Sequence, residues 1–164
     1  MSLESGGRAD KYGNQYENRY LAKLLLRLIN EEIVSVEVEP LGIEGEGVEF
    51  ISTDVHGNQN YYQCKASNTT HSSWTMSDLQ RHDVFNRSKR HIESGDQKYY
   101  YFISPLQYGE LDELCKRART NSSAQDFLTY QINNPKIKAV FSECEKHYSL
   151  DKNNPQELKN LIYI

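Results

Sequence analysis

No apolar run in this sequence of 164 residues approaches the ~20 residues that a helix needs to cross a bilayer. The N-terminal stretch "MSLESGG" also lacks the basic-then-apolar layout of a secretory signal. These absences argue against membrane-spanning and secreted proteins, so we expect a cytoplasmic protein without a membrane partner. We expect residues 1–10 to be a flexible leader.

Three further absences remove common kinds of site. The three cysteines lie far apart without C-x-x-C spacing, which argues against a disulfide framework and favours buried, reduced thiols. The five histidines lack the paired spacing of a zinc site. The glycine-rich "GIEGEG" is not followed by Gly-Lys-Ser/Thr, so we reject a nucleotide-binding loop.

A basic excess is missing as well, since the formal net charge is -4, whereas nucleic-acid-binding domains are usually basic. One predicted helix nevertheless concentrates cations that could contact phosphate groups without reading a base sequence. These candidate nucleic-acid-binding residues are Arg81, Arg87, Lys89 and Arg90. An ordinary solvated helix face explains the same cluster equally well. A second, weaker basic cluster comprises Lys116, Arg117 and Arg119.

The length of the chain predicts one domain, over residues 11–164, a size that buries a core without disulfides. Leucines recur at helical spacing within 16–30, where we expect an amphipathic helix. Three β-type segments then follow, two of them with clear alternation or aromatic enrichment. They are 33–40, 47–55 and 58–66.

The second half of the chain predicts more helix than strand. Thr75 and Asp78 form a capping-box pattern that opens a helix over 76–93, and "KYYYFIS" predicts a buried strand. Further helices are expected near 109–120, 122–132 with a Ser122 cap, 136–148, and from about Pro155. We therefore expect an α/β fold with an α-β-β-β-α-β core, a central mixed sheet flanked by helices, and extra C-terminal helices.

Two glutamates are candidates for a site, and each has a simpler explanation. Glu17 continues the leucine stripe of the first helix, which directs its carboxylate toward the sheet. A helix cap formed with Asn14 explains it as well. Glu49 stands between two apolar residues in the second strand, where a solvated strand face would account for it.

The turn residues Gly57 and Asn58 predict a hairpin that makes the second and third strands antiparallel neighbours. We expect Val55 to lie opposite Gln59 across this turn. A slip of one residue would change which side chains share a face.

That pairing places Glu49 directly across from Lys65, with Gln63 as their diagonal neighbour on the same face. A cross-strand ion pair, worth under about 1 kcal/mol when exposed, accounts for Glu49 and Lys65 alone. Carboxylate and amide oxygens are hard ligands suited to Mg²⁺, and a lysine beside such an ion can orient the attacking water. The grouping therefore favours a site that cleaves phosphate esters.

The order of a helical Glu17, "GVE" with Glu49, and "QCK" with Gln63 and Lys65 resembles the PD-(D/E)xK nuclease superfamily, whose fold is restriction-endonuclease-like. More narrowly, "YGNQYE", "LLLRLI", "YYQCKAS" and "WTMSDL" look like the nuclease domain at the N-terminus of bacterial anti-phage effectors, a double-stranded DNA endonuclease. The resemblance covers residues 6–105 well and the C-terminal helices loosely.

This resemblance implies metal-dependent hydrolysis of DNA phosphodiester bonds in anti-phage defence. Glu49 and Gln63 would bind Mg²⁺, with Mn²⁺ as a substitute, Lys65 would be the catalytic lysine, and Glu17 a supporting acid. Fusion to a sensor or regulatory domain is implied too, and the apolar end "LIYI" favours a domain excised from a longer protein. A homo-oligomer stays open.

Two positions depart from the superfamily pattern. The strand acid is usually aspartate, and Glu49 adds a methylene, while Gln63 stands where a glutamate is common and removes a charge. Two alternatives therefore stay open: a catalytically impaired domain that binds DNA or acts as a scaffold, and a nuclease for RNA or branched DNA.

Overall fold

The computed structural model describes residues 4–66, 72–95, 97–120 and 123–148, with the backbone alone for 4–14, 92, 119 and 124. The chain divides into two compact units, which are treated separately below. The sheet unit comprises Met1–Thr70 and Arg90–Leu106, and the helical unit comprises His71–Lys89 and Gln107–Ile164. The expectation of one domain over 11–164 stays a prediction.

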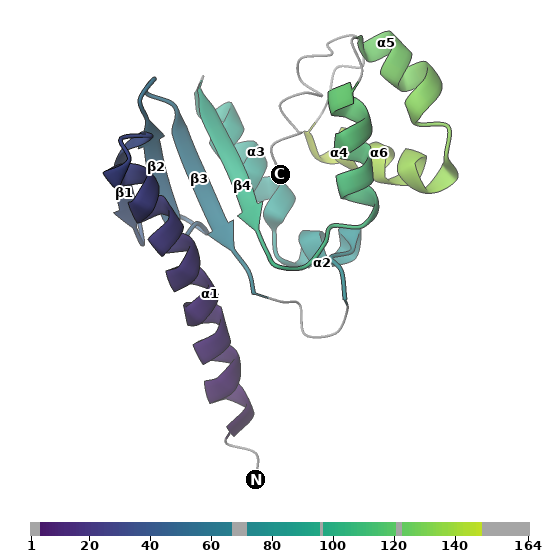
Figure 1. Cartoon of the computed structure of the whole chain (residues 1–164). Coiled ribbons are helices and arrows are strands. Elements are labelled where there is room, and N and C mark those ends of the chain that lie inside the picture. Colours follow the sequence, from purple (N-terminus) through teal and green to yellow (C-terminus); the bar gives the residue numbers. More distant parts are fainter. Residues whose placement is uncertain (1–3, 67–71, 96, 121–122, 149–164) are drawn as a thin grey trace. The chain divides into compact units, whose positions relative to one another are not determined.

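The sheet unit is built on four strands in the order β1-β2-β3-β4 (Figure 1). The first three strands are antiparallel neighbours, whereas β3 and β4 run parallel, so the sheet is mixed. This confirms the predicted α/β class and the central mixed sheet. The elements are α1 (Glu4–Ile29), β1 (Ile33–Val38), β2 (Phe50–Asp54), β3 (Gln59–Cys64) and β4 (Lys98–Ile103).

Helical residues cover both faces of this sheet. On one face, Leu24 of α1 packs in a buried cluster with Phe50, Tyr62 and Cys64. On the other face, the ring of His91, from the end of α3 (Val84–Glu93), stacks on Tyr61. Alternation along β3 explains this division, because successive side chains of a strand point to opposite faces.

The hairpin between β2 and β3 is antiparallel, as predicted, but its predicted register is wrong. Thr53, not Val55, lies opposite Gln59. The Asp54 carboxylate accepts hydrogen bonds from the backbone N–H of His56 at 2.8 Å and of Asn58 at 2.9 Å, which ends the strand early. An aspartate that binds backbone groups ahead of it is a common turn device. The correction moves the pairing by two residues, so the faces are kept.

Two predicted helices have other boundaries. The first begins at Glu4, earlier than the expected start at residue 16. The second opens with the predicted capping box between Thr75 and Asp78, but it forms two helices, α2 (Met76–Arg81) and α3. Asp83 lies between them with φ 58, a left-handed conformation that cannot continue a right-handed helix.

The helical unit confirms the expected helices near 109–120 and 136–148 as α4 (Glu110–Thr120) and α6 (Pro135–Tyr148). Between them, α5 (Ala124–Asp126) leads into a π-helical turn, η1 (Phe127–Gln131), where one α-helix was expected. The predicted cap at Ser122 and the short helix near Pro155 lie outside the described residues. Trp74 is buried in this unit.

Candidate active site

Glu49 and Lys65 form the centre of the candidate site. Lys65 follows the last residue of β3, and its Nζ donates to Oε1 of Glu49 at 3.1 Å. The backbone N–H of Cys64 donates to the other carboxylate oxygen, Oε2, at 2.6 Å. The Lys65 side chain is 31% exposed and that of Glu49 is 22% exposed, so both are screened from water in part but remain reachable.

Backbone hydrogen bonds fix where these two residues lie. The Glu49 N–H donates to the Tyr62 carbonyl at 2.8 Å, just before β2 begins. Lys65 donates its N–H to the Ile103 carbonyl at 2.9 Å, one residue beyond the pairing of Cys64 with Ile103. Gly47 precedes the acid at φ 79, a left-handed conformation that glycine adopts without a steric cost. The sheet therefore positions both side chains.

Glu17 belongs to the same electrostatic environment. Its side chain is half-buried on α1, and burial raises the pKa of its carboxyl group. The negative charge of Glu49 raises this pKa further, while the positive charge of Lys65 lowers it. The fold thus brings three of the four predicted catalytic residues together. The alternative of a helix cap formed with Asn14 is wrong, because α1 begins at Glu4 and both residues lie inside the helix.

The thiol of Cys64 is part of the buried core cluster and is influenced by these acidic groups. Burial raises its pKa to about 12, and the charges of Glu49 and Glu17 add to the effect. A thiol with this pKa stays protonated at neutral pH and is a poor nucleophile. Cys64, Cys115 and Cys144 are all buried and free, which confirms the expectation of buried thiols.

Gln63 has a different setting from the other three residues. Its side chain is 0% exposed, and its Oε1 atom accepts a hydrogen bond from the hydroxyl group of Tyr100. The Nε2 atom has no hydrogen-bond partner among the described residues. Tyr100 uses one of the two lone pairs of the carboxamide oxygen, and the side chain is fully buried, so Gln63 is less suited to bind a cation in this arrangement than the partly exposed Glu49.

The donor set for a metal is consequently smaller than predicted. No group of three or more His, Cys, Asp or Glu side chains within the described ranges could hold a metal ion. Mg²⁺ takes few protein ligands and completes its shell with water and phosphate oxygens. The repulsion that raises the pKa of Glu17 is what a divalent cation beside Glu17 and Glu49 would relieve. Two carboxylates of this kind fit Mg²⁺ or Mn²⁺.

The predicted nucleic-acid-binding residues are largely paired with acids. Arg81 lies 3.5 Å from the buried carboxylate of Asp78, and Arg87 lies 3.7 Å from the carboxylate of Asp83, which is partly exposed. Arg90, which belongs to the sheet unit, pairs with Glu46. Arg81, Arg87 and Lys89 belong to the helical unit. These pairs lower the net positive charge of the helix, which favours the solvated-face alternative.

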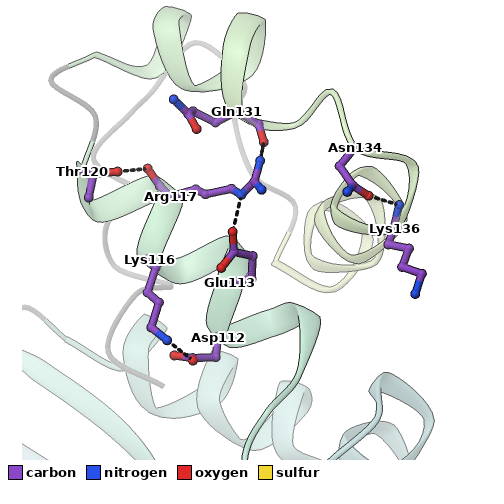
Figure 2. A network of polar contacts seen from close by, with 8 residues as sticks. All are labelled: Asp112, Glu113, Lys116, Arg117, Thr120, Gln131, Asn134 and Lys136. Carbon is purple, nitrogen blue, oxygen red and sulfur yellow. Dashed lines mark hydrogen bonds and ion pairs between the residues drawn. The ribbon is translucent and has the colours of Figure 1, made fainter.

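Two members of the second basic cluster, Lys116 and Arg117, pair with acids in the same way (Figure 2). Lys116 pairs with Asp112 at 2.5 Å and Arg117 with Glu113 at 2.8 Å, each four residues apart on α4. Arg117 also donates to the backbone carbonyl of Gln131 at 2.9 Å, which ties α4 to the end of η1. The arginine therefore serves the packing of the helical unit.

The sequence did not single out two contributors to the site region. One is the Cys64 N–H, which holds Glu49 and carries no side-chain signal. The other is Tyr100, whose hydroxyl engages Gln63. The parallel pairing of Tyr61 with Tyr100 makes Gln63 a diagonal neighbour of Tyr100, so knowledge of that register could have identified it.

Comparison with protein-family models, curated proteins and solved structures finds no match for this chain. Among the described residues, no helix is both long and apolar enough to span a bilayer. Membership of the PD-(D/E)xK superfamily therefore stays a hypothesis that depends on the residues themselves.

Proposed function

We propose that this chain is a metal-dependent endonuclease that hydrolyses phosphodiester bonds in double-stranded DNA. The observation that carries this proposal is the contact between Lys65 Nζ and the Glu49 carboxylate, with Glu17 in the same charge cluster. An amine and a carboxylate at the ends of adjacent strands, with a second carboxylate from the middle of α1, suit phosphate chemistry. Membership of the PD-(D/E)xK superfamily, a role in anti-phage defence and a cytoplasmic location belong to the same proposal.

Lys65 has the part of the catalytic lysine in this proposal. An ammonium group has three N–H donors, and the contact with Glu49 directs one of them. The others can bind a phosphate oxygen or the attacking water, where a positive charge stabilises the negative charge that develops on phosphorus oxygens. Glu49 keeps the amine in place, because its own carboxylate is fixed by the Cys64 N–H.

Glu17 and Glu49 would hold the metal ion. A bound Mg²⁺ supplies charge neutralisation at the phosphate and lowers the pKa of its water ligand. In the metal-free protein, burial and the charge of Glu49 raise the pKa of Glu17, so a cation bound by both carboxylates would relieve an unfavourable charge. Gln63 is left with an indirect part, through its hydrogen bond with Tyr100.

A second candidate function is DNA binding by a nuclease-like domain with impaired catalysis. The engagement of Gln63 favours it, because the residue expected to complete the metal site is fully buried and bonded elsewhere. The two candidates differ in one respect that can be measured. Only a nuclease would cleave the DNA when metal is supplied.

The experiment compares four labelled substrates: duplex DNA, single-stranded DNA, a branched DNA junction and duplex RNA. Each is incubated with the full chain in Mg²⁺, Mn²⁺ or excess chelator. The proposal expects cleavage of duplex DNA with either metal and none with chelator. Binding of duplex DNA without cleavage in both metals would favour the second candidate, and preferential cleavage of RNA or the junction would contradict the assignment of substrate.

A further inference from the structure

Helix α1 carries two apolar faces, and the sheet uses only one of them. Leu24 is buried in the core, and Leu21 and Leu28 pack against the same cluster. A second set of apolar residues lies at helical spacing on another side of the helix. In each turn it includes the residue that directly follows a core-facing one. This set, named here the α1 outer face, consists of Ala22, Leu25, Leu26 and Ile29.

The α1 outer face is in contact with solvent. Leu25 is 44% exposed, Leu26 62% and Ile29 75%, and Ala22 is exposed as well. Single exposed apolar residues are ordinary, but four at i, i+3, i+4 and i+7 form a continuous patch of the kind that binds another protein. Figure 1 shows α1 alongside β1 and β2, and the exposed fractions indicate that its outer face is accessible within the sheet unit.

We infer that a second copy of this chain covers the α1 outer face, with the two α1 helices packed antiparallel about a two-fold axis. If the axis passes between Leu25 and Leu26, each Leu25 meets the partner's Leu26. The same symmetry sets the small Ala22 against the large Ile29 of the partner subunit. Small residues then meet large ones across the axis, so the face is self-complementary, as an isologous dimer requires.

The charges at the two ends of the patch agree with this orientation. Arg19 is exposed at the N-terminal end, and Glu31 and Glu32 are exposed just beyond the C-terminal end of α1. The antiparallel arrangement brings Arg19 opposite these acids of the partner. A parallel arrangement would instead bring each Arg19 beside the partner's Arg19, and like charges at an interface oppose association.

This inference concerns assembly and does not depend on the proposed nuclease activity. One helix pair makes a small interface, so we expect a dissociation constant on the order of micromolar. If the chain is a nuclease, the dimer holds two copies of the Lys65 site, one for each strand of a duplex.

The first test is sedimentation equilibrium of the full chain over a hundredfold range of concentration. We expect a monomer–dimer equilibrium in the wild type and at least about tenfold weaker association in Leu26→Glu, because the new carboxylate is then buried against the partner's Leu25 without an opposite charge. Leu41→Glu is the matched control, since Leu41 is 91% exposed in the loop after β1 and lies outside the patch. A monomeric wild type, or a dimer that Leu26→Glu leaves intact, would overturn the inference.

The second test addresses orientation and does not rely on a single disruptive variant. Arg19→Glu and Glu31→Lys are each expected to weaken self-association. Glu31 is chosen because Glu32 already pairs with Arg27 of its own chain at 3.1 Å. Mixing the two variants restores attraction at both ends of the helix pair, so the mixture should dimerise more tightly than either variant alone. No gain on mixing would contradict the antiparallel arrangement.

Discussion

Glu49 holds Lys65 through one carboxylate oxygen while its other oxygen is held by the backbone of the neighbouring strand. The Lys65 Nζ to Glu49 Oε1 distance is 3.1 Å, and the Cys64 N–H lies 2.6 Å from Oε2. Because each oxygen has its own donor, the carboxylate has little freedom to rotate. The longer side chain of glutamate, compared with the usual aspartate, is accommodated by this double contact, and the lysine is positioned without help from Gln63.

The first prediction concerns metal binding at Glu49. Mg²⁺ should raise the melting temperature of the wild type, because a ligand that binds only the folded state stabilises it by mass action. Glu49→Gln keeps the shape of the side chain but removes its charge, and we expect it to abolish this increase. The effect is measured by thermal unfolding with and without Mg²⁺ at about 10 mM, a concentration roughly 100 times the dissociation constant of a weak site. Glu37→Gln, on the exposed side of β1, is the control that should still respond.

The second prediction is that Glu17→Gln stabilises the metal-free protein at neutral pH. The pKa of Glu17 is raised by burial and by Glu49, so ionising it costs free energy in the folded state. This cost is absent below the unfolded pKa and grows as the pH rises through the folded pKa. The gain in melting temperature should therefore be larger at pH 7.5 than at pH 4. An equal gain at both values would contradict the charge argument.

The third prediction concerns Tyr100 and Gln63. Tyr100→Phe should lower the free energy of unfolding by about 1–3 kcal/mol, because it leaves the buried Gln63 oxygen without a donor. Removing both partners, in Tyr100→Phe with Gln63→Met, should cost less than the sum of the single changes. Urea unfolding of the four proteins of this cycle measures the coupling. Strict additivity would show that the hydrogen bond contributes nothing.

The same variants test the part of Gln63 in the site. Since its carboxamide oxygen is engaged by Tyr100, Gln63→Met should retain the stabilisation by Mg²⁺ that Glu49→Gln loses. If Gln63→Met loses the Mg²⁺ response while circular dichroism shows an intact fold, Gln63 is a metal ligand after all.

The fourth prediction is a loss of stability below about pH 6.5 that depends on His91. Burial lowers the pKa of this histidine from its ordinary 6.5, and the charges of Arg90 and Lys98 lower it further. A hydrogen bond with the backbone of Glu46 and the charge of Glu44 raise the pKa, but the net shift is downward. The folded state then binds fewer protons than the unfolded state, so stability falls with decreasing pH, by at most about 1.4 kcal/mol per pH unit for one group.

Urea unfolding at pH 7.5 and at pH 5 measures this loss. His91→Gln cannot gain a proton, so its stability should change less between these two values than that of the wild type. His56→Gln is the control, because His56 is exposed in the hairpin turn. An unchanged pH dependence in His91→Gln would contradict the assignment to His91.

Much of the fold could be predicted because periodicity and turn residues are local signals. The leucine spacing of α1, the Thr75–Asp78 cap and the β2–β3 hairpin were all predicted, and the structure confirms them. The hairpin register was not, since it depends on how the Asp54 carboxylate binds the turn. The break at Asp83 was missed for a similar reason: a left-handed residue other than glycine leaves a weak mark in the sequence.

The candidate site shows the same division. Glu49 and Lys65 could be grouped because a two-residue error in register leaves side chains on the same face. Glu17 could be added because it continues the leucine spacing of α1. The setting of Gln63 could not be predicted, because its partner Tyr100 comes from a parallel strand that is distant in the sequence. The pairing of basic residues with nearby acids was readable in principle, since Asp83 and Arg87 stand four residues apart.

The most direct test of the central claim is the rate of plasmid cleavage in Mg²⁺ by the wild type, by Lys65→Ala and by Lys138→Ala. Lys138 is an exposed lysine of α6 and serves as the matched control. The account predicts that Lys138→Ala cleaves at the wild-type rate, whereas Lys65→Ala is slower by about 10²–10³-fold, as is typical when a charge-stabilising donor is removed. Equal cleavage by wild type and Lys65→Ala, or no cleavage by any of the three proteins, would contradict it.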